Sequence, residues 1–189
     1  MEKSAWSDNL LEFWFDSNMG KKLWFQSNSK LRNKIDREIT CKFSKILTKL
    51  ELKSSLDIIN SNSTTQIVAS IICLDQFSRH IYRDFPHCYG KIHTNSKKAI
   101  TLANYLCHSK RIYHLDEKFI PFILMPYKHD DIKLYFDHIK NVVSKFIDIQ
   151  IKSESQLYKF YMDTLKKYLL DDDHDPQKTK SIYAFSPAK

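Results

Sequence analysis

The sequence predicts an all-α fold made of antiparallel helix pairs, with about seven helices. Apolar residues recur at spacings of three and four along most of the chain, which is the pattern of amphipathic helices. Only Gly20 and Gly90 are glycines among 189 residues, whereas sheet-rich folds and phosphate-binding loops use glycine for positive φ or close backbone approach. The composition therefore favours helices and argues against a glycine-rich nucleotide site.

The first expected elements are a short helix and a long one. Ser7 or Asp8 can cap a helix over residues 10–15, and four aromatic residues around it are expected to anchor the core: Trp14, Phe15, Trp24 and Phe25. From residue 30 to about 52 the apolar positions follow helical periodicity, which predicts a long amphipathic helix. Its apolar positions are Leu31, Ile35, Ile39, Phe43, Ile46, Leu47 and Leu50.

The third helix has a clear start signal. Ser63 and Gln66 have the spacing of a capping box directly before an apolar run, so the helix should begin near Thr64. It should end near Tyr82 or Arg83. After the loop with Gly90, Thr94 or Asn95 is expected to cap a helix through Leu106, with four residues facing inward: Ala99, Leu102, Ala103 and Leu106.

The remaining helices are expected between residues 116 and 170. Asp116 opens an apolar helix that Pro126 should end, while Pro121 lies in its first turns, where proline is tolerated. Asp130 or Asp131 then caps a helix to residue 146. Ser153 and Gln156 form a second capping box before a helix that reaches residue 170. Residues 1–170 are thus expected to form a single helical domain, and residues 171–189 an acidic helix end and flexible tail.

The composition indicates in which cellular compartment the protein is expected. Hydrophobic residues make up 42% of the sequence, and the longest apolar run, residues 67–74, is much shorter than the ~20 residues that a membrane span needs. No early apolar stretch resembles a signal peptide. The four cysteines have no paired spacing, which fits reduced thiols: Cys41, Cys73, Cys88 and Cys107. We expect a soluble, cytoplasmic protein without membrane contact.

Positive charge is concentrated on the predicted second helix. Ten basic residues and three acidic ones lie between Gly20 and Lys53, within a chain of net charge +8. This segment can act as an electrostatic footprint for nucleic acid or an acidic partner. It can equally be an ordinary solvated helix face, since no aromatic-basic recognition motif accompanies the lysines.

The third helix changes from apolar to polar without a loop signal. Asp75 and Arg79 stand four residues apart, and Gln76, Arg79 and Arg83 stand three and four apart, so these long polar groups share one side of the helix. Apolar flanks predict that this helix is largely buried. A buried polar group needs a partner or a ligand, so the segment identifies a site.

Four blocks of the sequence resemble the bacterial domain-of-unknown-function 924 family. They are Phe13-Trp14-Phe15, Trp24-Phe25, the run from Leu74 to Arg83, and the run from Phe122 to Asp131. The resemblance covers roughly residues 10–146. It implies an all-helical fold similar to tetratricopeptide repeats, with no established activity.

The chain departs from the family pattern at several positions. Ser78 and His80 stand where the family usually has proline and asparagine, and Asp130-Asp131 replaces Ser-Glu. The family's C-terminal block is not legible between Tyr158 and Asp175. A site that depends on that block would be lost or altered here.

The family motif gathers six polar residues as site candidates: Asp75, Gln76, Arg79, Arg83, His129 and Asp131. One hypothesis is a groove between the third helix and the turn after Pro126, where the arginines bind a carboxylate or phosphate and His129 transfers protons. The alternative is a buried ion-pair and hydrogen-bond network that joins helices and needs no substrate.

The sequence is interpreted as a scaffold or binding domain for a protein or peptide, with a groove near the Asp75-Gln76-Phe77 helix. A first alternative is a small hydrolase or transferase for phosphate- or carboxylate-bearing substrates, centred on Arg79 and His129, so whether the protein is an enzyme stays open. A second is a nucleic-acid adaptor that uses the basic helix. No cofactor is expected, and no metal site either, because the histidines and cysteines between residues 87 and 114 lack the close pairs of zinc sites.

Overall fold

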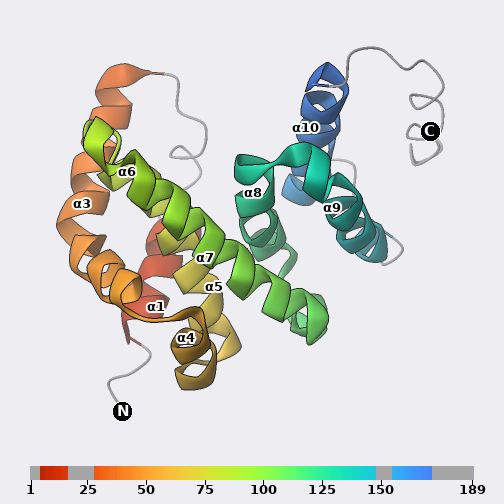
Figure 1. Cartoon of the computed structure of the whole chain (residues 1–189), viewed down its shortest axis with the longest axis horizontal. Helices are drawn as coiled ribbons and strands as arrows, with labels where there is room; N and C mark the ends of the chain where they lie inside the picture. Colours follow the sequence, from red (N-terminus) through yellow and green to blue (C-terminus); the bar gives the residue numbers. More distant parts are fainter. Residues whose placement is uncertain (1–4, 17–27, 148–154, 172–189) are drawn as a thin grey trace. The chain divides into compact units, whose positions relative to one another are not determined.

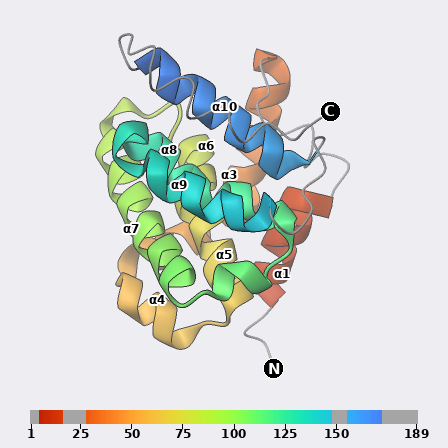
Figure 2. The same cartoon turned by 90° about the vertical axis from the view of Figure 1, so that its right-hand side faces the viewer.

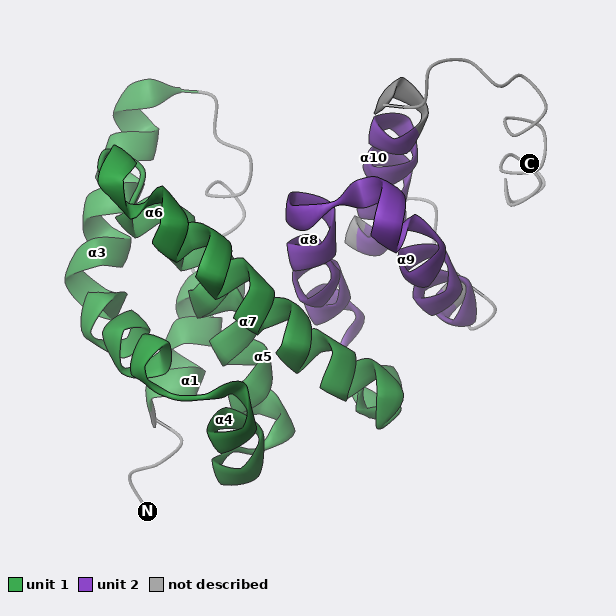
Figure 3. Cartoon of the chain, in the orientation of Figure 1, with its two compact units in different colours: residues 1–115 green, residues 116–189 purple. Residues whose placement is uncertain are grey.

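The computed structural model describes residues 5–16, 28–147 and 155–171, and these are helical nearly throughout, with no strand (Figure 1). The prediction of an all-α fold is confirmed. The chain divides into two compact units, residues 1–115 and 116–189 (Figure 3). The single domain and the tetratricopeptide-like arrangement stay predictions, as does the flexible tail, which lies outside the described residues.

Unit 1 begins with α1 (Ala5–Leu11), which continues into a π-helical turn, η1 (Glu12–Asp16). The long helix α3 (Ser29–Leu52) follows, and Asn28 caps it by accepting a hydrogen bond from the backbone N–H of Leu31. Its start and end agree with the predicted 30–52. The short helix α4 (Ser55–Ser61) comes next and was not predicted, although Ser54 and Asp57 cap it reciprocally.

The polar motif lies in a rod made of α5 (Thr64–Ile72), a π-helical turn η2 (Cys73–Phe77) and α6 (Ser78–Ile81). Ser63 and Gln66 form the predicted capping box, in which each side chain accepts from the other residue's backbone N–H. The rod ends at Ile81 with Tyr82 as its C-cap, close to the predicted end near Tyr82 or Arg83. It packs against α3 on one side and α7 on another, so its polar residues are held between two long helices (Figure 1).

Unit 1 closes with η3 (Pro86–Cys88), α7 (Tyr89–His108) and η4 (Arg111–His114). The predicted start of α7 at Thr94 or Asn95 is wrong, because the helix begins at Tyr89. Thr94 instead donates to the carbonyl of Gly90 within the helix, and Asn95 is buried. All four residues predicted to face inward from α7 are buried.

Unit 2 holds η5 (Glu117–Phe119), α8 (Ile120–Asp130), α9 (Ile132–Ile147) and α10 (Gln156–Asp171). Helices α9 and α10 pack side by side, and both contact α8 (Figure 2). Phe136 of α9 stacks on Tyr168 of α10 with ring centroids 4.1 Å apart. Aromatic and aliphatic side chains thus hold the three helices of this unit together.

Two more predicted helix boundaries in the described chain are wrong. Ser7 and Asp8 lie inside α1, since that helix already begins at Ala5. Pro126 lies inside α8 rather than after it, although proline in a helix interior removes a hydrogen bond and costs about 3 kcal/mol. Residues 120–127 of α8 are all buried, and this packing outweighs that cost.

Side-chain hydrogen bonds identify the N-terminal capping residues of the last two helices. Asp131, and not Asp130, caps α9, because its carboxylate accepts from the backbone N–H groups of Lys133 and Leu134. The hydroxyl of Ser155 accepts from the N–H of Tyr158 at the start of α10. The predicted capping residue, Ser153, lies outside the described residues.

The core of unit 1 is aromatic at its centre. Phe77, the phenylalanine of the motif, lies 4.9 Å from Phe43 and 5.2 Å from Trp14 between ring centroids. Trp14, Phe43 and Phe77 are all buried. The motif therefore contributes a core side chain as well as polar groups. Within the described residues, no helix is both long and apolar enough to cross a membrane.

Candidate functional site

The first polar cluster of the motif centres on Asp75, whose side chain is fully buried. Arg79, one turn later, approaches its Oδ1 from Nε and Nη2 at 3.4 Å. Ser96 of α7 donates to the same oxygen at 2.9 Å and accepts from Arg79 Nη2 at 2.9 Å. Gln76 donates to Oδ2. This cluster joins the rod to α7. It also supplies hydrogen bonds to both oxygens of the buried Asp75 carboxylate.

A second cluster joins the same rod to α3. Asp36 of α3 is 7% exposed, and its Oδ1 lies 2.6 Å from His80 Nδ1. Arg83 Nε donates to Asp36 Oδ2 at 2.8 Å. Because a carboxylate only accepts hydrogen bonds, Nδ1 of His80 carries the proton toward Asp36. The other ring nitrogen, Nε2, keeps its lone pair when the ring is neutral.

The ionisation of Asp36 is controlled by these neighbours. Burial opposes ionisation, but the hydrogen bonds and charges of His80 and Arg83 outweigh it and hold the pKa of Asp36 below its usual value. Asp36 is therefore an anion at neutral pH, and the side chains of His80 and Arg83 are both hydrogen-bonded to it. The oriented imidazole is the arrangement that enzymes use to hold a general base.

A third cluster surrounds Glu51 at the end of α3. Its Oε1 accepts from the hydroxyl of Tyr82 at 2.9 Å and from the side-chain amide of Asn95 at 2.7 Å. Burial, followed by this hydrogen bond, raises the pKa of Tyr82. Lys98 Nζ donates to three backbone carbonyls at the C-terminus of α3, those of Leu50, Glu51 and Lys53. This cluster fixes the end of α3 against α7.

Beside the second cluster, the surface forms a depression of about 400 Å³ between α3 and the end of the rod, which we call the α3–α6 groove. Its polar lining residues include exposed Arg37 and Thr40 together with His80. Ile81 and Phe85 supply apolar surface, and Phe85 is 51% exposed. The complete lining is Asn33, Asp36, Arg37, Thr40, Cys41, His80, Ile81, Asp84 and Phe85.

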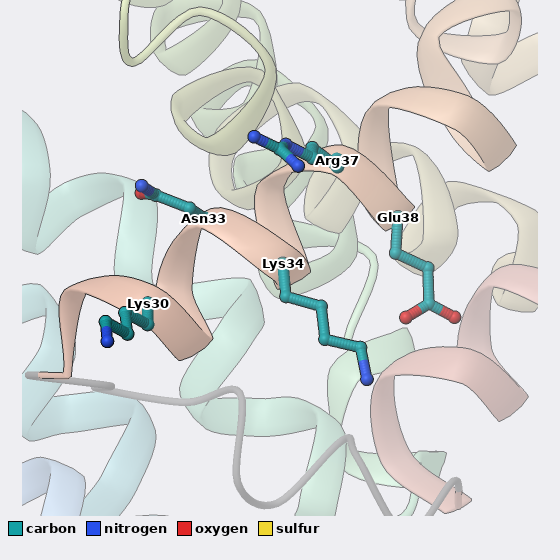
Figure 4. Close-up of a pocket in the computed structure, with 5 residues that line it drawn as sticks. All are labelled: Lys30, Asn33, Lys34, Arg37 and Glu38. Atoms are coloured by element: carbon teal, nitrogen blue, oxygen red, sulfur yellow. The ribbon is translucent and has the colours of Figure 1, made fainter.

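A second depression of about 510 Å³ adjoins the groove and shares Asn33 and Arg37 with it. Its other described lining residues are Lys30, Lys34 and Glu38, all from α3. Figure 4 shows Asn33 and Arg37 directed to one side of the helix and Lys34 and Glu38 to the other. We call this region the basic shoulder of the groove.

The structure divides the six predicted site residues among different places. Asp75, Gln76 and Arg79 lie in the first cluster, and Arg83 lies in the second, bonded to Asp36. His129 stands in the last turn of α8, and Asp131 caps α9, so both belong to unit 2. The hypothesis that all six converge on one groove stays a prediction.

Sequence reasoning missed Asp36 and the role of His80. The two residues are 44 positions apart, so no local spacing relates them. His80 had a local signal, since Arg83 follows three residues later, just past the end of α6. Among the described residues, no group of three or more histidine, cysteine, aspartate or glutamate side chains is placed to hold a metal ion.

Comparison with known proteins places the chain in a family. No curated protein and no solved structure matches it significantly. A family model described as bacterial protein of unknown function (DUF924) matches residues 10–171, which is most of the chain and extends over the larger part of both units. On that match, together with the motif helix at the centre of its first unit, the chain belongs to the DUF924 family.

Proposed function

We propose that this protein is a binding domain whose α3–α6 groove takes an acidic segment of another protein. One observation carries the proposal. Two adjoining depressions, of about 400 and 510 Å³, meet at Asn33 and Arg37 and extend along the first half of α3. From Lys30 to Cys41 the helix rises about 16 Å, a length that suits several residues of a peptide better than a small metabolite.

The charges around the groove favour an acidic ligand. Lys30, Lys34 and Arg37 are exposed and form no hydrogen bond or ion pair within the described part of the chain. The nearby acids Asp36 and Glu38 are engaged, Asp36 by Arg83 and His80 and Glu38 by Lys42 at 2.8 Å. Among the described residues that line the groove, Asp84 is the exposed acid. Basic groups therefore outnumber the acids that remain available.

The groove also offers hydrogen bonds and apolar contact. Asn33 presents a side-chain amide, and Phe85 leaves half of its surface in water. A ligand with carboxylates for Arg37 and Lys34, and one apolar side chain for Phe85, would match these groups. The suitable partner is an acidic peptide segment that carries an aromatic or aliphatic residue.

The other two functions have less support from the geometry. Arg79 directs its donors at Asp75 and Ser96, which leaves fewer of them for the substrate of a hydrolase or transferase. A nucleic-acid adaptor would use phosphate contacts from the same lysines, but Phe85 is the single exposed aromatic ring lining the described groove. A short acidic peptide therefore fits the charges and the apolar surface of the groove better than either alternative.

The test is fluorescence anisotropy with a labelled peptide that alternates glutamate and proline around one tryptophan. Proline prevents helix formation, so the probe stays extended. We expect wild-type protein to bind it and the double variant Lys34→Gln/Arg37→Gln to bind at least tenfold more weakly. Affinity should decrease as salt rises, because the contacts are exposed charges.

The matched control is Lys45→Gln/Lys166→Gln, which removes the same charge from exposed positions outside the groove. Its affinity should stay within twofold of wild type. Equal weakening in both double variants would mean that only net charge matters, and the proposal would fail. It would also fail if wild type preferred a single-stranded oligonucleotide of equal charge.

A further inference from the structure

A second groove lies on the other side of α3, against α1, and it differs from the first in chemistry. Two adjoining depressions of about 560 and 390 Å³ share Trp6 and Ile46. Six apolar side chains line this α1–α3 groove: Trp6, Phe13, Phe43, Ile46, Leu50 and Leu52. None of the described residues lining the α3–α6 groove is among them.

The floor of the α1–α3 groove belongs to the protein core, whereas one wall is left in water. Phe13, Phe43 and Leu50 are buried, and the rings of Phe13 and Phe43 lie 5.2 Å apart. Trp6 and Ile46 are partly exposed, and Leu52 is 84% exposed. A single exposed leucine is common on proteins, but here it continues an apolar groove, and contiguous exposed apolar surface is typical of interaction sites.

The rim carries a positive charge excess. Lys42, Lys49 and Lys53 line the groove, whereas Glu12 is the one acidic residue among its described lining. Lys42 is already committed, since its Nζ pairs with Glu38 and lies 4.7 Å from the Phe13 ring centroid. Lys49 is exposed and forms no ion pair within the described residues. The rim is therefore complementary to acidic side chains that flank an apolar surface.

The length of the α1–α3 groove suits a short helix. Lys42 and Lys53 mark its two ends, which are about 16 Å apart along α3. This distance corresponds to about three turns of an α-helix. A helix of that length places apolar residues at i, i+3, i+4 and i+7 on one face, and this is the usual arrangement of a helix in a groove.

We propose that the α1–α3 groove is a second docking surface, and that its occupant is an amphipathic helix of a partner protein with acidic residues beside its apolar face. The leucine or isoleucine side chains of that helix would contact Trp6, Ile46 and Leu52. Its glutamates or aspartates would pair with Lys49 and Lys53. This inference is independent of the acidic peptide proposed for the α3–α6 groove.

The probe is a labelled synthetic helix of about three to four turns, with leucine at i, i+3, i+4 and i+7 and glutamate at the flanking positions. A second probe has lysine in place of every glutamate. We expect wild-type protein to bind the glutamate probe and to bind the lysine probe at least tenfold more weakly. Lys49→Glu/Leu52→Glu should weaken the glutamate probe at least tenfold.

Leu52→Glu should leave the fold intact because Leu52 is already in water, and a thermal melt checks this. The matched control is Lys45→Glu/Leu134→Glu, which makes the same two chemical changes at exposed positions outside the groove. It should bind within twofold of wild type. Lys34→Gln/Arg37→Gln, which tests the other groove, should also leave this affinity unchanged.

The following outcomes would overturn the proposal. They are no binding of the glutamate probe, equal binding of both probes, equal weakening in the two double variants, and concentration-dependent self-association that Leu52→Glu abolishes. The last outcome would make the groove an interface between copies of this chain. Binding to anionic lipid vesicles that exceeds binding to the helix would also contradict a protein partner.

Discussion

Asp75 shows how a single buried charge can define a sequence motif. Its side chain has no exposed surface, yet Ser96 and Arg79 supply hydrogen bonds and a compensating charge. An uncompensated buried carboxylate would cost several kcal/mol. The residues around Asp75 in the motif are therefore explained first by the stability of the fold. Ligand contact is not needed to account for them.

Arg79→Ala tests this explanation. We expect the free energy of unfolding to decrease by about 2 kcal/mol, less than for a fully buried pair, because Arg79 keeps 34% of its side chain exposed and Ser96 still donates to Asp75. Urea unfolding measures the loss. Arg37→Ala, at an exposed position where no described residue pairs with the arginine, should stay within about 0.5 kcal/mol of wild type. Wild-type stability in the Arg79 variant would contradict the role of the pair.

Asp36 gives a pH dependence with a defined sign. Its pKa is lower in the folded protein than in the unfolded chain, so ionised Asp36 stabilises the fold above pH ~4. This contribution disappears as pH falls through the folded pKa. We expect the stability difference between wild type and Asp36→Asn to be full near pH 5 and to shrink below about pH 4.

Urea unfolding at a series of acidic pH values measures this difference. Asp137→Asn is the control, because Asp137 is exposed and has no partner within the described part of the chain. Its difference from wild type should be small at every pH. A stability difference for Asp36→Asn that did not change between about pH 5 and pH 2 would show that Asp36 is not held ionised by His80 and Arg83.

The helix α3 is the element on which both grooves and two polar clusters depend. Its end is held by Lys98 of α7, which donates to three carbonyls at 2.7–3.1 Å. Such carbonyls have no partners inside their own helix. Burial lowers the pKa of Lys98, because the ammonium exchanges part of its hydration for these hydrogen bonds. Lys98 thus adds to the backbone cap of α3, in which the N–H of Lys53 donates to the carbonyl of Leu50 at 3.3 Å.

Lys98→Met keeps the aliphatic stem and removes the ammonium. We expect a loss of about 1–2 kcal/mol in the free energy of unfolding, because hydrogen bonds from a charged donor are removed. Hydrogen exchange should become faster at the N–H groups of the last turn of α3. The control is Lys45→Met, at an exposed position on α3. It should change neither the free energy of unfolding nor the exchange rates. Unchanged exchange in the Lys98 variant would contradict the capping role.

The elements that sequence could predict are those specified locally. Periodicity located α3, and the Ser63–Gln66 pair located the start of α5. The start of α7 at Tyr89 was missed because no side chain caps it. Pro126 was misassigned because burial of α8 outweighs a local rule. Asp36 and His80 come together only through packing of α3 against the rod, and no local pattern contains that information.

At the scale of the whole molecule, the described features with the clearest binding potential lie in unit 1. Both grooves flank α3, and all three polar clusters join the rod, α3 and α7. The net charge of +8 favours acidic partners in general. At physiological ionic strength, however, exposed charges act over about 8 Å. Specific recognition must therefore come from the grooves themselves.

The most direct test of the central claim is to map where the extended acidic peptide binds. In a titration followed by amide chemical shifts, we expect the largest changes between residues 33 and 41 and between residues 80 and 85, which line the α3–α6 groove. Lys34→Gln/Arg37→Gln should suppress these changes. Shifts largest along the α1–α3 groove or in unit 2, or no shifts at all, would contradict the assignment of this groove as the binding site.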